Sequence, residues 1–361
     1  TGVQTCALPI YLGKKLNHDS DIQYLPQGTE AYLTHGMEDY FEPAIHIRHN
    51  DNNSSLLLKY VDHSSNAIGN GVNETVITLK DDKYPVTVKL HYVAYGKENI
   101  IRTFTEISHE EKKPVILCKY ASSMLHLNSS KYFLTEFSGD WAHEANVTER
   151  ELAFGKKVID TKLGARANMF VSPFFQLALD NPSQENAGEV LVGTIGWTGN
   201  FRFTFEVDNK NELRIISGIN PYDSEYSLPA KEVFRTPDFY FTYSTQGKGE
   251  ASRNFHDWAR NHQVKKGNET RMTLLNNWES TYFDFDENKL IGLMDEATKL
   301  GVDMSLLDDG WFANLNLNGD IHSSNAFAFF PHLEEIFNRD DTTLNENPLF
   351  KPWRNKAKTG R

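Results

Sequence analysis

The sequence has few cysteines and no residue spacing that is typical of a metal site. Only Cys6 and Cys118 occur in 361 residues, which excludes a disulfide framework and a cysteine-rich zinc site. The 13 histidines are scattered, without a His-Glu-x-x-His or comparable spacing. We therefore expect no metal and no cofactor.

Long apolar runs and an excess of positive charge are also missing. No stretch approaches the roughly eighteen consecutive apolar residues of a membrane-spanning helix. The net charge of −12 disfavours nucleic acid and anionic membranes as partners, because both would repel the chain. The 39% of hydrophobic residues can still bury a core, and 361 residues exceed the usual size of one core. We therefore expect two domains.

The most informative segment is an apolar strand that ends in two carboxylates, a glycine and two aromatic residues. We predict a strand at 304–307, buried on both faces and followed by Asp308, Asp309 and Gly-Trp-Phe. Parallel α/β sheets place ligands at the carboxyl ends of their strands. Carboxylates accept hydrogen bonds from sugar hydroxyls, and aromatic rings stack on the C–H face of a pyranose. The pattern favours a sugar site, although Asp-Asp-Gly is also ordinary turn sequence.

A second short strand lies upstream and ends in the same way. Leu274-Leu275 is followed by Asn-Asn-Trp278-Glu, and a helix comes next, with Asp286 as its N-cap and Gly301 as its stop. This is a β-α-β unit whose two strands should be parallel neighbours, with Trp278 at the same end of the sheet as the two aspartates. The unit fits a (β/α)₈ barrel or a doubly wound sheet.

Residues 11 to about 264 show the short, alternating runs of an all-β domain. Examples are 74–79, 86–93, 190–195 and 201–207, separated by clusters of Asn, Asp, Gly and Lys. Roughly twenty such strands indicate a large antiparallel sandwich. A linking helix is expected at 252–263, with His256 as a structural histidine on it, and Trp197 is expected in the sandwich core.

Several motifs, in order, resemble glycoside hydrolase family 36, the bacterial α-galactosidases. They are Tyr11-Leu-Gly-Lys-Lys-Leu, Ser138-Gly-Asp-Trp-Ala-His-Glu, Asp160-Thr-Lys-Leu-Gly-Ala-Arg, Trp197-Thr-Gly-Asn-Phe, Gly218-Ile-Asn-Pro, Ser252-Arg-Asn-Phe-His, Leu275-Asn-Asn-Trp-Glu-Ser-Thr-Tyr-Phe-Asp-Phe and Leu306-Leu-Asp-Asp-Gly-Trp-Phe. The resemblance runs from about residue 11 to 312. It implies a β plus α/β fold, in which an N-terminal antiparallel β-supersandwich precedes the first strands of a (β/α)₈ TIM barrel.

The resemblance also implies an activity and a substrate site. Members hydrolyse terminal α-galactosyl residues of melibiose and raffinose-type sugars with retention, and Trp278, Asp308 and Asp309 match positions that bind galactose. Trp141 matches a sandwich tryptophan that lines the pocket, although core packing is an alternative for it. Asp39 resembles a loop acid that reaches a neighbouring subunit's site, which implies a homo-oligomer, a tetramer, at full length.

The catalytic pair itself is not found. The family draws its nucleophile and its acid/base from aspartates on later barrel strands, and no Lys-Trp-Asp motif occurs in this chain. The resemblance fails after Phe312. We therefore expect this polypeptide to be an inactive fragment of an α-galactosidase. An α-N-acetylgalactosaminidase and a non-catalytic carbohydrate-binding β-sandwich are the alternatives.

These observations divide the chain into four parts. Residues 1–10 look like the translation of a sequencing adapter, 11–266 the supersandwich with its linking helix, 267–312 the start of the barrel, and 313–361 a divergent tail of foreign, frame-shifted or inserted sequence. We expect a small-molecule galactoside as partner, no nucleic acid and no membrane. A cytoplasmic location is expected, and a lost export signal would change it.

Overall fold

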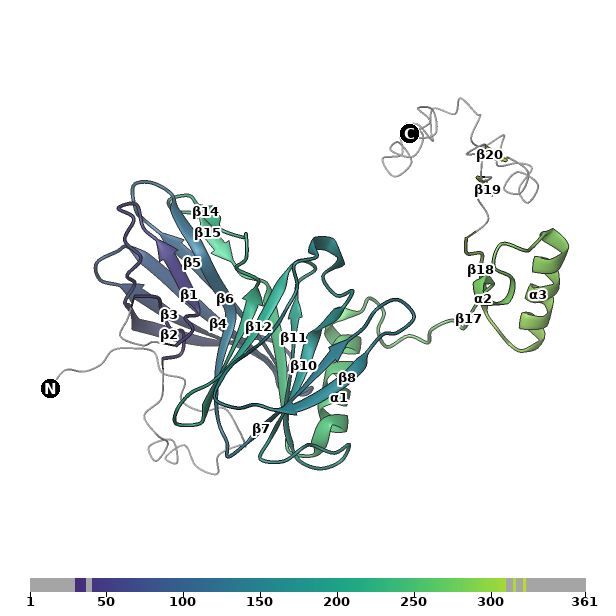
Figure 1. Ribbon diagram of the computed structural model, residues 1–361, viewed down its shortest axis with the longest axis horizontal. Helices are drawn as coiled ribbons and strands as arrows, with labels where there is room; N and C mark the ends of the chain where they lie inside the picture. The colour runs from purple at the N-terminus through teal and green to yellow at the C-terminus, as the bar shows by residue number, and fades with distance from the viewer. Residues whose placement is uncertain (1–29, 37–40, 310–313, 316–320, 323–361) are drawn as a thin grey trace. The chain divides into compact units, whose positions relative to one another are not determined.

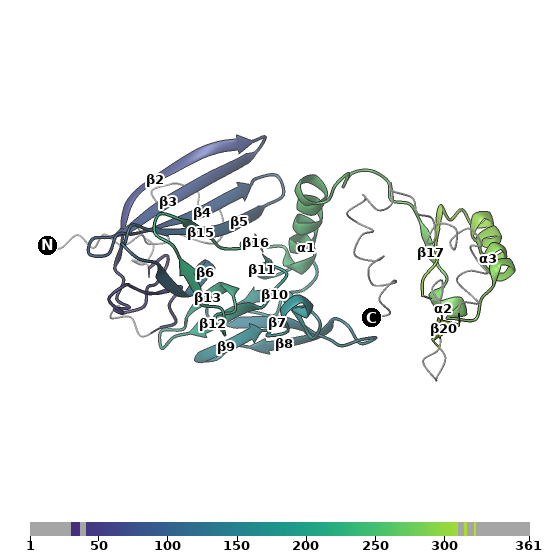
Figure 2. The same ribbon diagram turned by 90° about the horizontal axis from the view of Figure 1, so that it is seen from above.

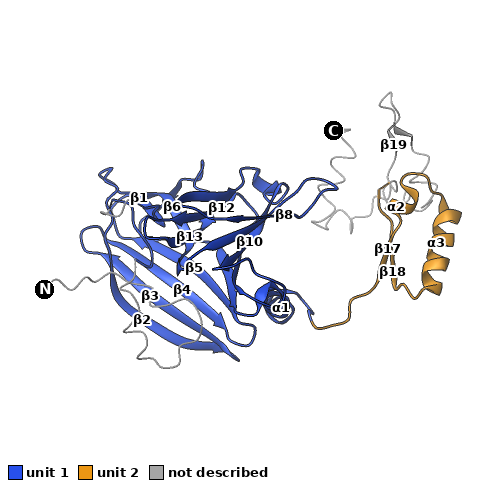
Figure 3. Cartoon of the chain, turned by 60° about the horizontal axis from the view of Figure 1, so that its bottom comes forward, with its two compact units in different colours: residues 1–267 blue, residues 268–361 orange. Residues whose placement is uncertain are grey.

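The computed structural model describes residues 30–36, 41–309, 314–315 and 321–322, which fall into two units, residues 1–267 and 268–361 (Figures 1 and 3). Strands β1 to β16 and helix α1 belong to the first unit. No helix among the described residues is long and apolar enough to cross a membrane.

The elements of the first unit are mostly antiparallel strands. Their bounds are β1 (Ile45–Arg48), β2 (Leu58–Gly69), β3 (Val72–Asp81), β4 (Val86–Tyr95), β5 (Ile100–His109), β6 (Val115–Asn128), β7 (Tyr132–Ser138), β8 (Asn146–Glu151), β9 (Gly155–Asp160), η2 (Gly164–Arg166), β10 (Val171–Leu179), β11 (Glu189–Gly196), β12 (Phe201–Val207), β13 (Glu212–Ile219), β14 (Tyr226–Leu228), β15 (Val233–Arg235), β16 (Asp238–Ser244), α1 (Gly247–Trp258) and η3 (Ala259–Gln263).

Two sheets form the predicted sandwich (Figure 2). The six-stranded sheet has the order β1-β6-β13-β12-β9, with β14 beside β6. The ten-stranded sheet has the order β2-β3-β4-β5-β16-β11-β10-β7-β8, with β15 beside β5. The alternation that predicted these strands is visible in β4, where Val86, Val88 and Leu90 are buried and Lys89 is exposed. The all-β prediction for this part of the chain is confirmed.

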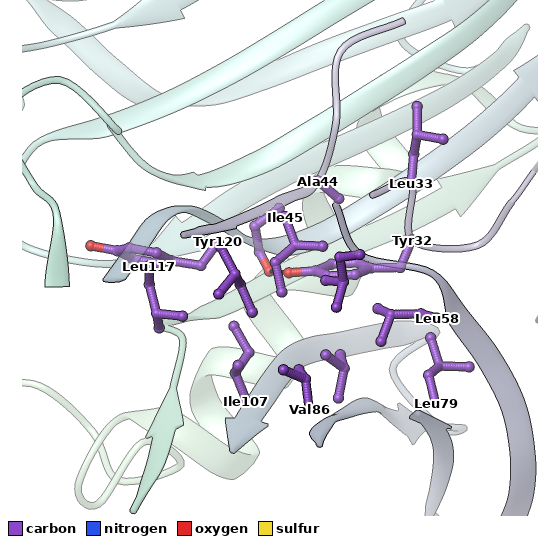
Figure 4. Packing of buried hydrophobic residues seen from close by; sticks show 14 of the residues in the cluster. Tyr32, Leu33, Ala44, Ile45, Leu58, Leu79, Val86, Ile107, Leu117 and Tyr120 are labelled. Carbon is purple, nitrogen blue, oxygen red and sulfur yellow. Dashed lines mark hydrogen bonds between the residues drawn. The ribbon is translucent and has the colours of Figure 1, made fainter. Parts of the chain in front are cut away.

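The sandwich core consists of two main apolar clusters. In the first, Ile45 and Leu117 pack with Val86 and Ile107, and Tyr32 lies among them (Figure 4). In the second, phenylalanines from the three strands β10, β12 and β16 pack together, and the Phe175 and Phe205 ring centroids are 4.9 Å apart at 88°.

Gly193 on β11 makes this aromatic packing possible. A Cβ at that position would lie 2.6 Å from Cζ of Phe175 and 2.8 Å from Cζ of Phe239, which is closer than real side chains approach. A strand glycine often marks such a close contact.

Helix α1 lies on the ten-stranded sheet and begins earlier than the sequence predicts. Ala251 is fully buried against Val190 and Val192 of β11. The helix starts at Gly247, not at residue 252, and the N–H groups of Lys248 and Gly249 in its first turn donate to Gln184 O and Glu185 O at 3.0 and 2.9 Å. A Cβ at Gly247 would approach the carbonyl oxygen of Gln184 to 2.4 Å. Tertiary packing therefore requires glycine where local propensity disfavours it. The last turn, η3, is π-helical.

The second unit contains the predicted β-α-β arrangement. Its described elements are β17 (Leu274–Asn276), α2 (Trp278–Thr281), α3 (Glu287–Lys299), β18 (Met304–Leu306), β19 (Asn314–Leu315) and β20 (Ile321–His322). The pairing of β17 with β18 is parallel, as expected. The side chain of Asp286 caps α3 by accepting from Lys289 N at 2.8 Å, and Gly301, with φ +78°, follows its end. Both helix boundaries were readable from the sequence.

The expected burial of the strand at 304–307 is wrong for the described residues. Met304 is 43% exposed and Leu306 is 48% exposed. Among the described elements, β18 pairs only with β17, so its other edge lacks a neighbouring strand.

Candidate functional site

The carboxyl ends of β17 and β18 are joined by side-chain hydrogen bonds. Asn276 lies opposite Leu306 in the parallel register, so the residues that follow both strands meet at one edge. Asn276 Nδ2 donates to Asp308 Oδ2 at 2.6 Å, and Asn277 Oδ1 accepts from Asp308 N at 2.8 Å. Asn277 is buried and also donates to Thr281 Oγ1 at 3.0 Å. Two asparagines therefore hold Asp308 in place.

Asp308 and Asp309 differ in their surroundings. Asp308 accepts a second hydrogen bond, from Asp309 N to Oδ1 at 2.8 Å. The Asn276 amide, and then the Asp309 backbone N–H, hold the pKa of the Asp308 carboxyl below its usual range. The exposed Asp309 side chain has no hydrogen bond or ion pair within the described part of the chain. Asp308 is thus already engaged by the protein, whereas Asp309 is available to a ligand hydroxyl.

Trp278 lies beside this edge in a small aromatic cluster. Its ring meets Tyr282 edge to face at 5.3 Å and Phe283 at 4.9 Å. Tyr282 has φ +48°, a backbone conformation that is costly for a bulky side chain. Its N–H donates to Trp278 O at 2.7 Å, which closes the short turn of α2. An aromatic cluster therefore follows β17 at the same edge where Asp308 and Asp309 follow β18.

Several of these residues had no predicted role. Asn276, Asn277, Tyr282 and Phe283 were part of the quoted motifs, but no function was assigned to them. The sequence feature that could have indicated a role is the Asn-Asn pair directly after the strand, because side-chain amides there can bind neighbouring backbone groups.

Trp141 lies on the loop between β7 and β8 and is 86% exposed, so the alternative of core packing is wrong. The loop is held by Gly139 N, which donates to Phe170 O at 3.0 Å, and by Asp140 Oδ1, which accepts from Trp141 N at 2.7 Å. A large exposed ring on a well-held loop suits ligand contact. Trp141 belongs to the first unit and Trp278 to the second, and Asp39 lies outside the described residues.

Two further expectations have different outcomes. Trp197 is 40% exposed, so its expected place in the sandwich core is wrong. Strand β11 ends at Gly196, and Trp197 already belongs to the turn, where its ring covers Gly199. His256 is exposed on α1, and its Nε2 lies 3.5 Å from Ser252 Oγ. In the sequence, His256 is remote from the residues that follow β17 and β18. A structural role stays the prediction for it.

The described residues contain no group of three or more His, Cys, Asp or Glu side chains placed to hold a metal ion. The candidate site consists of carboxylates, amides and aromatic rings. Such groups can orient a neutral polyol by hydrogen bonding and stacking.

Comparisons with known proteins find the same enzyme family over most of the chain. Residues 10–229 match the model of the glycosyl hydrolase family 36 N-terminal domain, and residues 233–324 match the melibiase model. An alpha-galactosidase from Lactobacillus acidophilus is 29% identical over 323 residues, 85% of this chain and 43% of the relative. The alpha-galactosidase AgaA from Geobacillus stearothermophilus is 32% identical over 262 residues, 72% of this chain and 35% of the relative.

Solved structures show the same similarity. A variant of the Geobacillus stearothermophilus alpha-galactosidase in complex with raffinose superposes with a TM-score of 0.78 at 26% identity, over 86% of this chain and 48% of that one. The chain spans less than half the length of these relatives.

Proposed function

Because the chain belongs to glycosyl hydrolase family 36, we propose that it is part of an α-galactosidase that hydrolyses terminal α-galactosyl residues of melibiose and raffinose-type sugars. The observation that carries this proposal is the meeting of Trp278, Asp308 and Asp309 at the carboxyl edge of a parallel strand pair. Solved relatives with raffinose and with stachyose support the substrate class.

The three residues have different roles in the proposed site. Asp309 accepts hydrogen bonds from the hydroxyls that distinguish galactose from glucose, and Asp308 completes this acidic surface while it is held by Asn276. A sugar that lacks the matching hydroxyl leaves a carboxylate unpaired, which costs about 1–3 kcal/mol or more. The Trp278 ring provides an apolar face for the pyranose. Trp141 is proposed as a further pocket residue from the sandwich.

Hydrolysis with retention requires two more carboxylates. One attacks the anomeric carbon and forms a covalent galactosyl-enzyme intermediate, and the other first protonates the leaving oxygen and then activates water. We assign neither role to Asp308 or Asp309. The two catalytic aspartates are proposed to lie on later barrel strands of the whole protein.

The whole protein is proposed to be a homo-oligomer, a tetramer, in which Asp39 contributes to a neighbouring subunit's site. We also propose that it acts in the cytoplasm. Both statements stay predictions. Asp39 lies outside the described residues.

Activity of the whole protein and of this chain tests the proposal. The whole protein should hydrolyse p-nitrophenyl α-galactoside faster than p-nitrophenyl α-N-acetylgalactosaminide, with net retention visible by NMR of the first product. The 361-residue chain should match a buffer control. A whole protein that prefers the N-acetylated substrate would establish the alternative activity, and turnover by this chain would require another nucleophile, with Asp308 the first to examine.

A further inference from the structure

Three sequence motifs that have no role in the proposed site come together at one end of the sandwich. Asp160 ends β9, Asn200 precedes β12, and Asn220 follows β13. These strands are neighbours in the six-stranded sheet and run antiparallel, so the three residues lie at the same end of the sheet. They belong to the motifs Asp160-Thr-Lys-Leu-Gly-Ala-Arg, Trp197-Thr-Gly-Asn-Phe and Gly218-Ile-Asn-Pro.

The fully buried side chain of Asn220 joins the other two motifs. Its Nδ2 donates to Asp160 Oδ2 at 3.3 Å and to Thr161 O at 3.0 Å, and its backbone N–H donates to Asn200 O at 3.0 Å. Arg202, directly across from Asp160 in the register, donates to the same Oδ2 from Nε at 3.1 Å and from Nη2 at 2.7 Å. Both donors of the buried amide are used, and breaking either bond would leave a polar group unpaired.

Asn200 extends this network to the loop that follows β9. Its Oδ1 accepts a hydrogen bond from Gly164 N at 2.7 Å. Gly164 begins the single turn η2, and a Cβ added to it would meet nothing within 4 Å. Little packing therefore supports the loop at this point, and the hydrogen bond to Asn200 is important for holding it.

The far end of the same loop supports the loop that carries Trp141. Phe170 O accepts a hydrogen bond from Gly139 N at 3.0 Å. Gly139 begins the loop between β7 and β8, and a Cβ there would lie 3.0 Å from Cα of Glu144, so the base of this loop is closely packed. Residues 161–170 therefore connect the buried network to the base of the Trp141 loop.

We propose that Asn200 and Asn220 are positioning residues for Trp141 in the sugar site and act through residues 161–170. The proposal rests on the proposed function, in which Trp141 is a pocket residue. The Trp141 side chain is 86% exposed, so its own packing does little to fix it and the backbone of its loop has to hold it. An indole that is held in place before the sugar binds loses less conformational freedom on binding, which strengthens the affinity.

Hydrogen exchange of this chain, followed by mass spectrometry, measures the support of the loops. Asn200→Ala removes the acceptor of Gly164 N, and the amides of residues 161–170 and 139–143 should exchange about two- to tenfold faster, the effect of losing one hydrogen bond. Asn200→Asp keeps an acceptor oxygen and should restore the wild-type rates. Ser130→Ala removes a 2.8 Å side-chain hydrogen bond at the opposite end of β7, and this matched control should leave both loops unchanged.

Kinetics of the whole protein show whether this support matters for sugar binding. Trp141→Ala and Asn200→Ala should each raise KM for p-nitrophenyl α-galactoside about two- to tenfold with kcat unchanged, because a pocket residue away from the reacting bond binds substrate and transition state alike. If Asn200 acts through Trp141, the double variant should have the KM of Trp141→Ala alone. Asn200→Asp should again behave like the wild type.

Three results would overturn the positioning proposal in an active enzyme. They are unchanged exchange in Asn200→Ala, effects on KM that add up in the double variant, and a loss confined to kcat. If circular dichroism shows that Asn200→Ala does not fold, Asn200→Ser, with a shorter acceptor, takes its place in the same comparison. A whole protein without α-galactosidase activity would overturn the proposed function, and with it the role in sugar binding, even if exchange shows that Asn200 holds the loop.

Discussion

The half-buried imidazole of His126 should make the sandwich less stable as the pH falls below neutrality. His126 lies on β6, directly across from Arg214 on β13, and its Nε2 is 2.9 Å from the carbonyl oxygen of Glu30. A neutral ring can donate its Nε2–H to that carbonyl. Burial first, and then the Arg214 guanidinium, lower the pKa of His126 from 6.5 to about 4.

The sign and size of the effect follow from this pKa. The unfolded chain takes up the proton near pH 6.5, whereas the folded chain resists it until about pH 4. The stabilising contribution is therefore complete above about pH 6.5 and is lost as the pH falls toward 4. A lowering of about 2.5 pKa units corresponds to at most about 3.4 kcal/mol. The ring is not fully buried, and solvent screening reduces the expected loss to about 1–3 kcal/mol.

His126→Gln tests this reasoning, because glutamine keeps a side-chain N–H donor and does not titrate in this range. Urea unfolding of both proteins, followed between about pH 7.5 and 4.5, should show that the wild type loses more stability than the variant. His256→Gln, at an exposed histidine on α1, is the control and should follow the wild type. Parallel profiles for the wild type and His126→Gln would refute the assignment.

Three further predictions concern the site, the core and the boundary. In the whole protein, Asp309→Ala should lower kcat/KM for p-nitrophenyl α-galactoside at least about tenfold, or about 1.4 kcal/mol, with the melting temperature unchanged; unaltered kinetics would favour an ordinary turn. Gly193→Ala should destabilise the sandwich by about 1–3 kcal/mol in urea unfolding, since its Cβ would overlap the Phe175 and Phe239 rings, and an unchanged midpoint would contradict the packing. Limited proteolysis should leave a product of about residues 11–264, because the sandwich has its own core while β17 and β18 are exposed, and mass spectrometry would expose a product that ends inside the sandwich.

Local sequence predicts an element well when local burial or capping decides it. The run 201–207 was expected as a strand and is β12 with the same bounds, because its side chains pack in a large aromatic core. The cap at Asp286 was readable, since it needs only a side-chain oxygen and the N–H three residues later.

Long-range packing explains the elements that the sequence did not predict. The start of α1 at Gly247 depends on contact with Gln184, 63 positions earlier in the numbering. The place of Trp197 depends on where β11 ends. In the candidate site, the shared edge of Trp278 and the two aspartates followed from parallel pairing. The hydrogen bond from Asn276 to Asp308 did not, because it joins two strand ends whose detailed register only the folded pair defines.

The surroundings of Asp308 also argue against a role as general acid for it. A general acid in glycoside hydrolysis needs a raised pKa, so that it holds a proton at working pH. The Asn276 amide and the Asp309 N–H lower the pKa of Asp308 instead, which keeps its carboxylate ionised. Its two oxygens accept hydrogen bonds at 2.6 and 2.8 Å, and these fix the orientation of the carboxylate. An ionised carboxylate held by two donors is suited to fixing the position of a neighbouring group, and the proton that the leaving oxygen needs has to come from another carboxyl group.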